Sequence, residues 1–149
     1  MPAPYQIVKY TDAHREQLLD VWEKSVLATH HFLKPGDFTA IKEIVKTIDF
    51  HALDVYCLVQ DNTVCGFTGV AEQKVEMLFL SPGYFGKGLG RKLMSFAIQE
   101  LKADRVDVNE QNIDAVAFYK KLGFNIYERT DKDDQGNDYP LLRMSLNKD

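Results

Sequence analysis

The sequence has no apolar run that approaches the roughly 20 residues needed to cross a bilayer. Its N-terminus, MPAPYQIVKY, also lacks the basic region followed by an apolar stretch that is typical of a secretory signal. We therefore expect a cytoplasmic protein without a membrane partner.

Cysteine is also scarce, and the chain has no net positive charge. There are two cysteines, Cys57 and Cys65, and no CxxC motif, which is too few for a disulfide scaffold or a structural zinc site. We expect reduced thiols in the core, although a hairpin could bring the two close together. The formal net charge of −4 predicts no nucleic-acid partner, since an overall basic surface is missing and only a local basic patch could form.

The remaining composition is that of an ordinary globular protein. With 149 residues, of which 45% are hydrophobic and 27% charged, the chain can bury one core, so we predict a single domain over residues 1–149. The hydrophobic period alternates between that of strands and that of helices, which predicts a mixed α/β (α+β) fold. Strands are expected at residues 5–10, 55–59, 64–70, 75–80, 106–108, 124–129 and 139–146, and helices around residues 12–26, 41–48, 89–101 and 114–122.

Local signals define several of these elements more closely. The inward face of the first helix is predicted from spacings of three and four residues, and it comprises Leu18, Val21, Trp22, Ser25 and Val26. Residues 29–38, THHFLKPGDF, interrupt the helical pattern. Asp61-Asn62 predicts a hairpin turn, and Gly123 predicts the end of the last helix.

A glycine-rich loop separates the expected strand 75–80 from the helix that follows. Its glycines alternate with larger residues in the order Gly86, Lys87, Gly88, Leu89, Gly90, Arg91. Glycine lets the backbone approach a ligand closely, and a helix N-terminus attracts anions, so the loop suits a phosphate or diphosphate. The alternative is a flexible turn followed by a solvated basic face. The P-loop and dinucleotide fingerprints both fail to match.

Two motifs resemble those of the GNAT acyl-CoA N-acyltransferases. The frame Phe85-Gly86-Lys87-Gly88-Leu89-Gly90 is similar to the family's Q/R-x-x-G-x-G/A, except that Phe85 offers no polar side chain. Residues 112–124, NIDAVAFYKKLGF, fill every fixed position of N-x-x-A-x-x-F-Y-x-x-x-G-F. More narrowly, VNEQNIDAVAFYKKLGF and DDQGNDYPLL resemble a bacterial subgroup, the YjaB-type peptidyl-lysine N-acetyltransferases.

The resemblance implies a fold, an activity and a set of ligands. The fold would be a mixed, mostly antiparallel sheet of about seven strands with four helices, in which the fourth strand bulges and splays from the fifth. The activity would be transfer of the acetyl group of acetyl-CoA to a primary amine of a protein or a small molecule, by direct attack and without a metal. The protein would be a monomer or a homodimer.

The same resemblance implies roles for individual residues. Leu78, Phe79 and Leu80 would bind the pantetheine arm, and residues 86–91 would bind the diphosphate. Asn112 would contact the coenzyme through its amide, and its alternative role is to cap the following helix. Tyr119 would be the general acid that protonates the departing thiolate, and its alternative role is that of a core aromatic residue.

The amine must lose a proton before it attacks, because an alkylammonium with a pKa of about 10.4 is not nucleophilic. Glu76 is the first candidate for the base, ahead of Glu72 and His30. Candidates for binding the acceptor are Trp22, His30, Phe32 and Tyr139, although Trp22 also fits the core. Adjacent His30 and His31 do not predict a metal site, since two neighbouring side chains do not easily face one ion.

Two competing functions remain open on the sequence alone. One is a coenzyme A-binding sensor or partner module that has lost catalysis. This alternative stays open because Phe85 departs from the Gln or Arg of the family motif. The other is a nucleotide enzyme that uses the glycine loop for phosphate. Thermal stabilisation by coenzyme A but not by ATP would separate the second from an acyltransferase.

Overall fold

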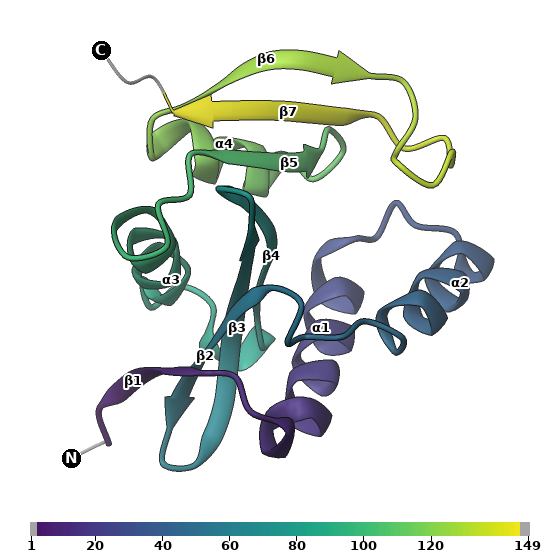
Figure 1. Cartoon of the computed structure of the whole chain (residues 1–149). Coiled ribbons are helices and arrows are strands. Elements are labelled where there is room, and N and C mark those ends of the chain that lie inside the picture. Colours follow the sequence, from purple (N-terminus) through teal and green to yellow (C-terminus); the bar gives the residue numbers. More distant parts are fainter. Residues whose placement is uncertain (1–2, 147–149) are drawn as a thin grey trace.

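A computed structural model describes residues 3–146, which form one seven-stranded sheet with helices on both faces (Figure 1). The strand order is β1-β2-β3-β4-β5-β7-β6, and every neighbouring pair is antiparallel except β4 and β5. The strands are β1 (Tyr5–Lys9), β2 (Asp54–Gln60), β3 (Thr63–Ala71), β4 (Lys74–Leu80), β5 (Arg105–Asn109), β6 (Phe124–Thr130) and β7 (Leu141–Leu146). The predicted mixed sheet of seven strands with four helices is confirmed.

The helices are α1 (Arg15–Thr29), α2 (Pro35–Val45), α3 (Leu89–Gln99) and α4 (Ile113–Lys121), with short 3-10 helices η1 (Asp12–His14) and η2 (Pro82–Tyr84). Helices α1 and α2 pack on one face of the sheet, and α3 and α4 pack on the other. None of the helices within residues 3–146 has the length and apolar character required to cross a membrane.

The two cysteines lie on opposite faces of the β2–β3 hairpin. Cys57 belongs to the core beneath α1, whereas Cys65 packs with Leu89 and Leu93 of α3. Both thiols are free and fully buried. The expectation that both thiols lie in the core is confirmed, and the hairpin does not bring them together.

The first helix matches its predicted face, and the second helix does not. The buried residues of α1 are the five that were predicted, Leu18, Val21, Trp22, Ser25 and Val26. Helix α2 begins at Pro35, inside the segment expected to be irregular, because proline is well suited to the first turn of a helix. It ends at Val45, so Ile48 packs on the core from the following turn, and Ile44 is 46% exposed.

Smaller differences occur at other element boundaries. Asp61 and Asn62 both adopt positive φ, as a tight hairpin turn requires, which confirms the predicted turn. Gly123 follows α4 with a φ of +101° and confirms the predicted helix end. Tyr139, in contrast, precedes β7, which begins at Leu141, because the segment before that strand is occupied in hydrogen bonds within its own loop.

The parallel pairing of β4 with β5 is short, and this creates the functional region of the fold. Only Lys74 and Val75 pair with β5, at Arg105 and Val106, after which the two strands separate. On its other side β4 pairs with β3, where Met77 faces Gly69 and Val75 faces Val70, so Glu76 is the extra residue of a β-bulge. The bulge and the splay were both expected for the fourth strand.

Candidate active site

A cleft of about 810 Å³ opens where β4 and β5 separate. It is bounded by both strands, by the glycine loop at the start of α3, by α4 and by the end of α1. Its walls contain most of the predicted site residues, namely Glu76, Leu78, Phe79, Leu80, Gly86, Gly88, Leu89, Gly90, Arg91, Asn112, Tyr119 and His30. We call this space the large cleft.

The glycine loop presents a series of unused hydrogen-bond donors to the large cleft. Gly86 and Gly88 have φ values of +77° and +76°, and a Cβ at either position would meet nothing within 4 Å. No hydrogen bond among the described residues uses the backbone N–H of any residue from 86 to 91. These donors lie at the positive end of the α3 dipole, and the arrangement suits an anionic group.

Strand β4 forms one long wall of the large cleft. Leu78, Phe79 and Leu80 pair with β3 on one side, at Thr68, Phe67 and Gly66. On the opposite side, the edge of β4 has no strand partner beyond Val75 within residues 3–146. A free strand edge can hydrogen-bond an extended ligand in the way that an added strand would.

Helix α4 contributes Tyr119 to the large cleft, and Asn112 lines the cleft from the N-cap position just before that helix. Tyr119 is 7% exposed, and its ring lies edge-on to Phe118 and Phe124. Its hydroxyl makes no hydrogen bond with the described residues, and burial raises the pKa of this phenol well above its ordinary value of 10, so the group stays protonated. Asn112 caps α4, because its side-chain oxygen accepts from the Ala115 N–H at 3.3 Å, which leaves its amide nitrogen for the cleft.

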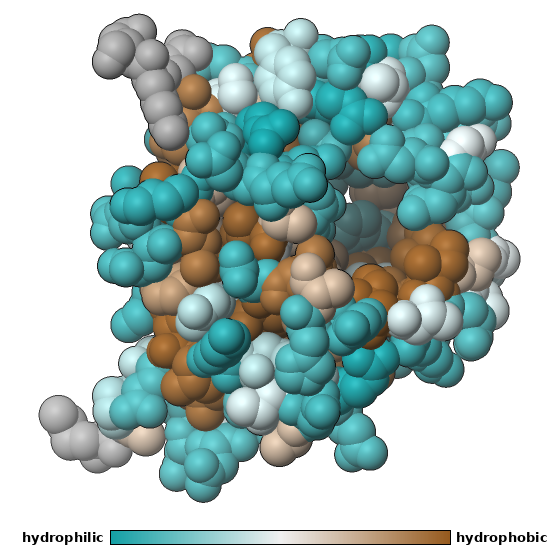
Figure 2. All heavy atoms as spheres, in the orientation of Figure 1, coloured by the Kyte–Doolittle hydropathy of each residue, from teal (hydrophilic) through white to brown (hydrophobic). Residues whose placement is uncertain are grey.

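A smaller cavity of about 280 Å³ adjoins the large cleft and shares His30, Glu76, Phe79 and Asp107 with it. Its other walls come from α1, α2 and the loop before β7, including Trp22 and Tyr139. Figure 2 shows a hollow between these helices and the β6–β7 end of the sheet, with apolar side chains below it and hydrophilic side chains above it. We call this space the small cavity.

Three of the predicted acceptor residues form a contact chain beside the small cavity. The Phe32 ring lies 5.3 Å from His30 and 6.0 Å from Tyr139 between ring centroids, although Phe32 lines neither space. The Tyr139 hydroxyl donates to Asp37 at 2.5 Å and accepts from the Lys34 N–H at 3.2 Å, which ties the loop before β7 to the start of α2. That charge-assisted bond raises the pKa of Tyr139.

Trp22 combines the two roles that the sequence left open. Its side chain is 5% exposed, belongs to the core under α1 and stacks on Phe38 with 5.9 Å between ring centroids. It also forms part of the wall of the small cavity. Trp22 is therefore a core residue with one surface on the cavity.

The structure adds charged residues that sequence reasoning missed. Asp107 accepts from Lys74 at 2.5 Å and from Arg143 at 2.7 Å, and it borders both spaces. Burial alone would lower the pKa of Lys74, but the hydrogen bond to Asp107 and the nearby charges of Asp107 and Glu76 raise it, so this amine remains a cation. Asp107 lies between Val106 and Val108, and an acid within a buried strand was the available signal.

Lys87 and Phe85 differ from the remainder of the loop. The Lys87 ammonium lies 5.8 Å from the centroid of the Tyr84 ring, and its side chain is not part of the cleft wall. Phe85 lines the large cleft and is 41% exposed. An exposed aromatic residue thus stands where the family motif has a polar side chain.

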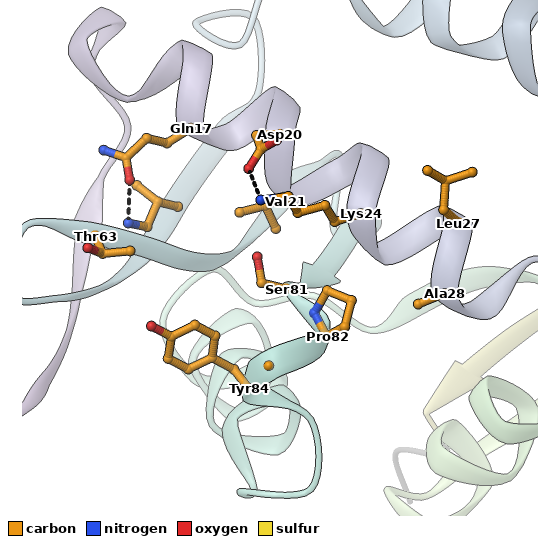
Figure 3. A pocket seen from close by; sticks show the side chains of 12 residues that line it. Gln17, Asp20, Val21, Lys24, Leu27, Ala28, Thr63, Ser81, Pro82 and Tyr84 are labelled. Atoms are coloured by element: carbon orange, nitrogen blue, oxygen red, sulfur yellow. Dashed lines mark hydrogen bonds and ion pairs between the residues drawn. The ribbon is translucent and has the colours of Figure 1, made fainter.

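Another cavity, of about 690 Å³, lies between α1 and η2 (Figure 3). Gln17 accepts from the Val64 N–H at its edge, and Lys24 pairs with Asp20 on the surface of α1. None of the predicted site residues lines it. Among residues 3–146 there is also no group of three or more His, Cys, Asp or Glu side chains that could hold a metal ion.

Comparison with known proteins agrees with the motifs and the fold. Residues 16–148 match the model of the acetyltransferase (GNAT) domain. The chain is 38% identical over 130 residues to the peptidyl-lysine N-acetyltransferase YjaB of Salmonella typhimurium strain LT2, covering 87% of this chain and 89% of that protein.

Solved structures share the same architecture. The solution structure of apo-form YjaB from Escherichia coli superposes with a TM-score of 0.87 at 32% identity, covering 96% of this chain and 97% of that one. PaiA N-acetyltransferase from Thermoplasma acidophilum, in complex with coenzyme A, has the same fold, with a TM-score of 0.67 at 20% identity over 96% of this chain and 99% of that one. The chain therefore belongs to the GNAT acetyltransferase family, a family of acyltransferases.

Proposed function

We propose that this chain transfers the acetyl group of acetyl-CoA directly to the side-chain amine of a lysine residue in a protein. Protein lysine is favoured over a small amine because the YjaB relative is named a peptidyl-lysine N-acetyltransferase. The acids Glu76, Asp107 and Asp134 at the small cavity also suit a cationic substrate.

The observation that carries the proposal is the run of unpartnered N–H groups from residue 86 to residue 91, all of which except that of Lys87 belong to residues on the wall of the large cleft. In the proposal these donors bind the diphosphate of the coenzyme. The free edge of β4 then holds the pantetheine arm along Leu78, Phe79 and Leu80, and the Asn112 amide contacts the same arm. The thioester is thereby placed at the junction of the large cleft and the small cavity.

Catalysis would follow from position and from charge. The lysine amine enters from the small cavity and attacks the thioester carbonyl, and a β4 backbone N–H, assigned to Leu80, stabilises the oxyanion. Tyr119 then donates its proton to the coenzyme thiolate. Its neutral phenol and its unpaired hydroxyl support this role. Glu76 and His30, both on the wall shared by the two spaces, are the candidates for removing the proton of the amine.

The direct test is to mix the protein with acetyl-CoA and lysine-containing peptides, and with free polyamines as a second arm, and to measure thiol release above hydrolysis. Peptide-dependent thiol release supports the proposal. Release with polyamines alone would contradict the protein acceptor. If coenzyme A raises the melting temperature but no amine stimulates thiol release, the chain is a coenzyme-binding module instead.

A further inference from the structure

His30 lies at the C-terminal end of α1 and is a titratable residue that borders both spaces. It follows the last residue of the helix, and its N–H donates to the Val26 carbonyl at 2.8 Å, which fixes its backbone. Its side chain lines the large cleft and the small cavity. A group at this junction can reach an amine that enters from one space toward a thioester in the other.

Hydrogen bonds in the last turn of α1 fix the tautomer of His30. The Thr29 hydroxyl donates to the Ser25 carbonyl at 2.7 Å, so its single proton is committed. The Thr29 oxygen lies 2.7 Å from His30 Nδ1 and can only accept from it. Neutral His30 therefore carries its proton on Nδ1 and keeps a lone pair on Nε2.

His30 Nε2 has no hydrogen-bond partner among the described residues. Among the side chains of residues 3–146, only the Tyr10 hydroxyl is a polar atom that is both fully buried and unpaired, so the unpaired Nε2 atom of His30 is not fully buried. Nε2 is therefore accessible. Because Nδ1–H also donates to Thr29 in the imidazolium, protonation of Nε2 requires no rearrangement of the bond that orients the ring.

The surroundings keep His30 neutral near pH 7. Burial lowers its pKa below the ordinary 6.5, and the charge of His31 lowers it further. The charged and titratable groups that line the small cavity opposite it are Lys74 and Glu76 from β4, Asp107 from β5, and Asp133, Asp134 and Tyr139 from the loop before β7. The positive charge of Lys74 is paired with Asp107, so it adds little net charge there.

Glu76 is the weaker candidate for the base. Its side chain is 40% exposed, and Oε1 lies 3.8 Å from the Lys74 ammonium. This ion pair engages the carboxylate of Glu76, whereas His30 Nε2 has no partner among the described residues. A carboxylate at this position is suited to attract and orient the ammonium rather than to deprotonate it.

We propose that His30 Nε2 is the general base that deprotonates the acceptor amine, and that Thr29 is the residue that positions it. This inference rests on the proposed acetyl transfer. One N–H bond of the ammonium breaks as Nε2 gains the proton, and the amine then forms a C–N bond with the thioester carbonyl. The C–S bond breaks as Tyr119 protonates the sulfur. The phenolate recovers a proton from the new amide nitrogen, and His30 releases its proton to water.

The test compares pH profiles of kcat/KM for a lysine-containing peptide in the wild type, His30→Gln, Glu76→Gln and the matched control His31→Gln. We expect the wild-type value to level off above about pH 6.5, where the base is neutral. His30→Gln should lose about 10²- to 10⁴-fold near pH 7. Its remaining activity should rise tenfold per pH unit up to about pH 9, since only free amine then reacts. His31→Gln should keep the plateau of kcat/KM. On the acid side its kcat/KM should begin to fall at a higher pH than that of the wild type, because the charge of His31 lowers the pKa of His30.

The positioning role of Thr29 is tested separately, by measuring kcat. Thr29→Val should lower kcat without changing the KM for acetyl-CoA, and Thr29→Ser should restore kcat because it returns the hydroxyl. Should His30→Gln fail to fold, as judged by loss of the thermal shift with coenzyme A, this pair carries the test.

Three results would overturn the inference: a His30→Gln profile with the wild-type shape, loss of the plateau in Glu76→Gln alone, or full activity in Thr29→Val. Absence of acetylation by the wild type with every amine would instead contradict the proposed function.

Discussion

Replacement of Gly88 by alanine tests whether the glycine loop binds the coenzyme. Gly88 has a φ of +76°, and a new Cβ would meet nothing within 4 Å, so the free protein suffers backbone strain but no clash. Such strain costs about 1–2 kcal/mol. Gly136 is a matched control, because its φ is +81°, its Cβ would also be in open space, and it does not line the large cleft.

The expected changes in unfolding free energy and in coenzyme affinity distinguish backbone strain from an effect on binding. Both variants should lose about 1–2 kcal/mol of unfolding free energy, which is roughly 2–8 °C in melting temperature for a chain of this size. Gly88→Ala should in addition weaken coenzyme A by about 10- to 100-fold. The new Cβ would occupy space that the diphosphate needs, and that range corresponds to moving a phosphate out of one charge-assisted hydrogen bond, worth about 1.5–3 kcal/mol.

The assay is thermal unfolding with increasing coenzyme A, together with calorimetric titration. Coenzyme A at 100 times its Kd stabilises the native state by about 2.7 kcal/mol. Gly136→Ala should show that full increment, and Gly88→Ala should need a far higher concentration to reach it. Equal coenzyme affinity in the two variants would refute the assignment of the loop.

Other substitutions test the remaining parts of the site. Tyr119→Phe should lower turnover about 10²- to 10⁴-fold in the thiol-release assay while the coenzyme Kd changes less than about twofold, and unchanged turnover would remove Tyr119 from the acid role. Asn112→Ala should lose about 1 kcal/mol of stability with the cap, whereas Asn112→Ser should retain the cap, and both should bind coenzyme A more weakly. Gly66→Ala should cost about 1–3 kcal/mol and weaken coenzyme binding, because its Cβ would lie 2.7 Å from the Phe79 carbonyl oxygen in the β4 wall. Because the folded-state pKa of His30 is lowered, the unfolded chain binds its proton first as pH falls below 6.5, so the unfolding free energy should drop from pH 7 to 5 more in the wild type than in His30→Gln.

The parts of the fold that could be predicted are those with strong local signals. The inward face of α1 follows from three- and four-residue spacing, and the turn at Asp61-Asn62 follows from residues that tolerate positive φ. Helix α2 was harder to predict because it begins at a proline after a polar segment, and because tertiary contacts keep Ile48 buried after the helix has ended.

The site residues also divide into those that a local sequence motif identifies and those that only the fold brings together. Its glycine loop and the Asn112 and Tyr119 frame are contiguous motifs, so they could be recognised in order along the chain. The pairing of Asp107 with Lys74 and Arg143 joins three strands, and although an acid within a buried strand marks Asp107, nothing local identifies its two partners. The wall that His30 shares with Glu76 likewise arises only when the end of α1 meets the β4 bulge. Long-range contacts of this kind leave no periodic pattern in the sequence.

Assigned amide chemical shifts, followed by NMR during titration with coenzyme A, test the central claim most directly. The account predicts that the backbone N–H groups of residues 86–91 show the largest shifts and become protected from solvent exchange. Shifts centred instead on the cavity of Gln17, Thr63 and Tyr84, with residues 86–91 unmoved, would contradict it.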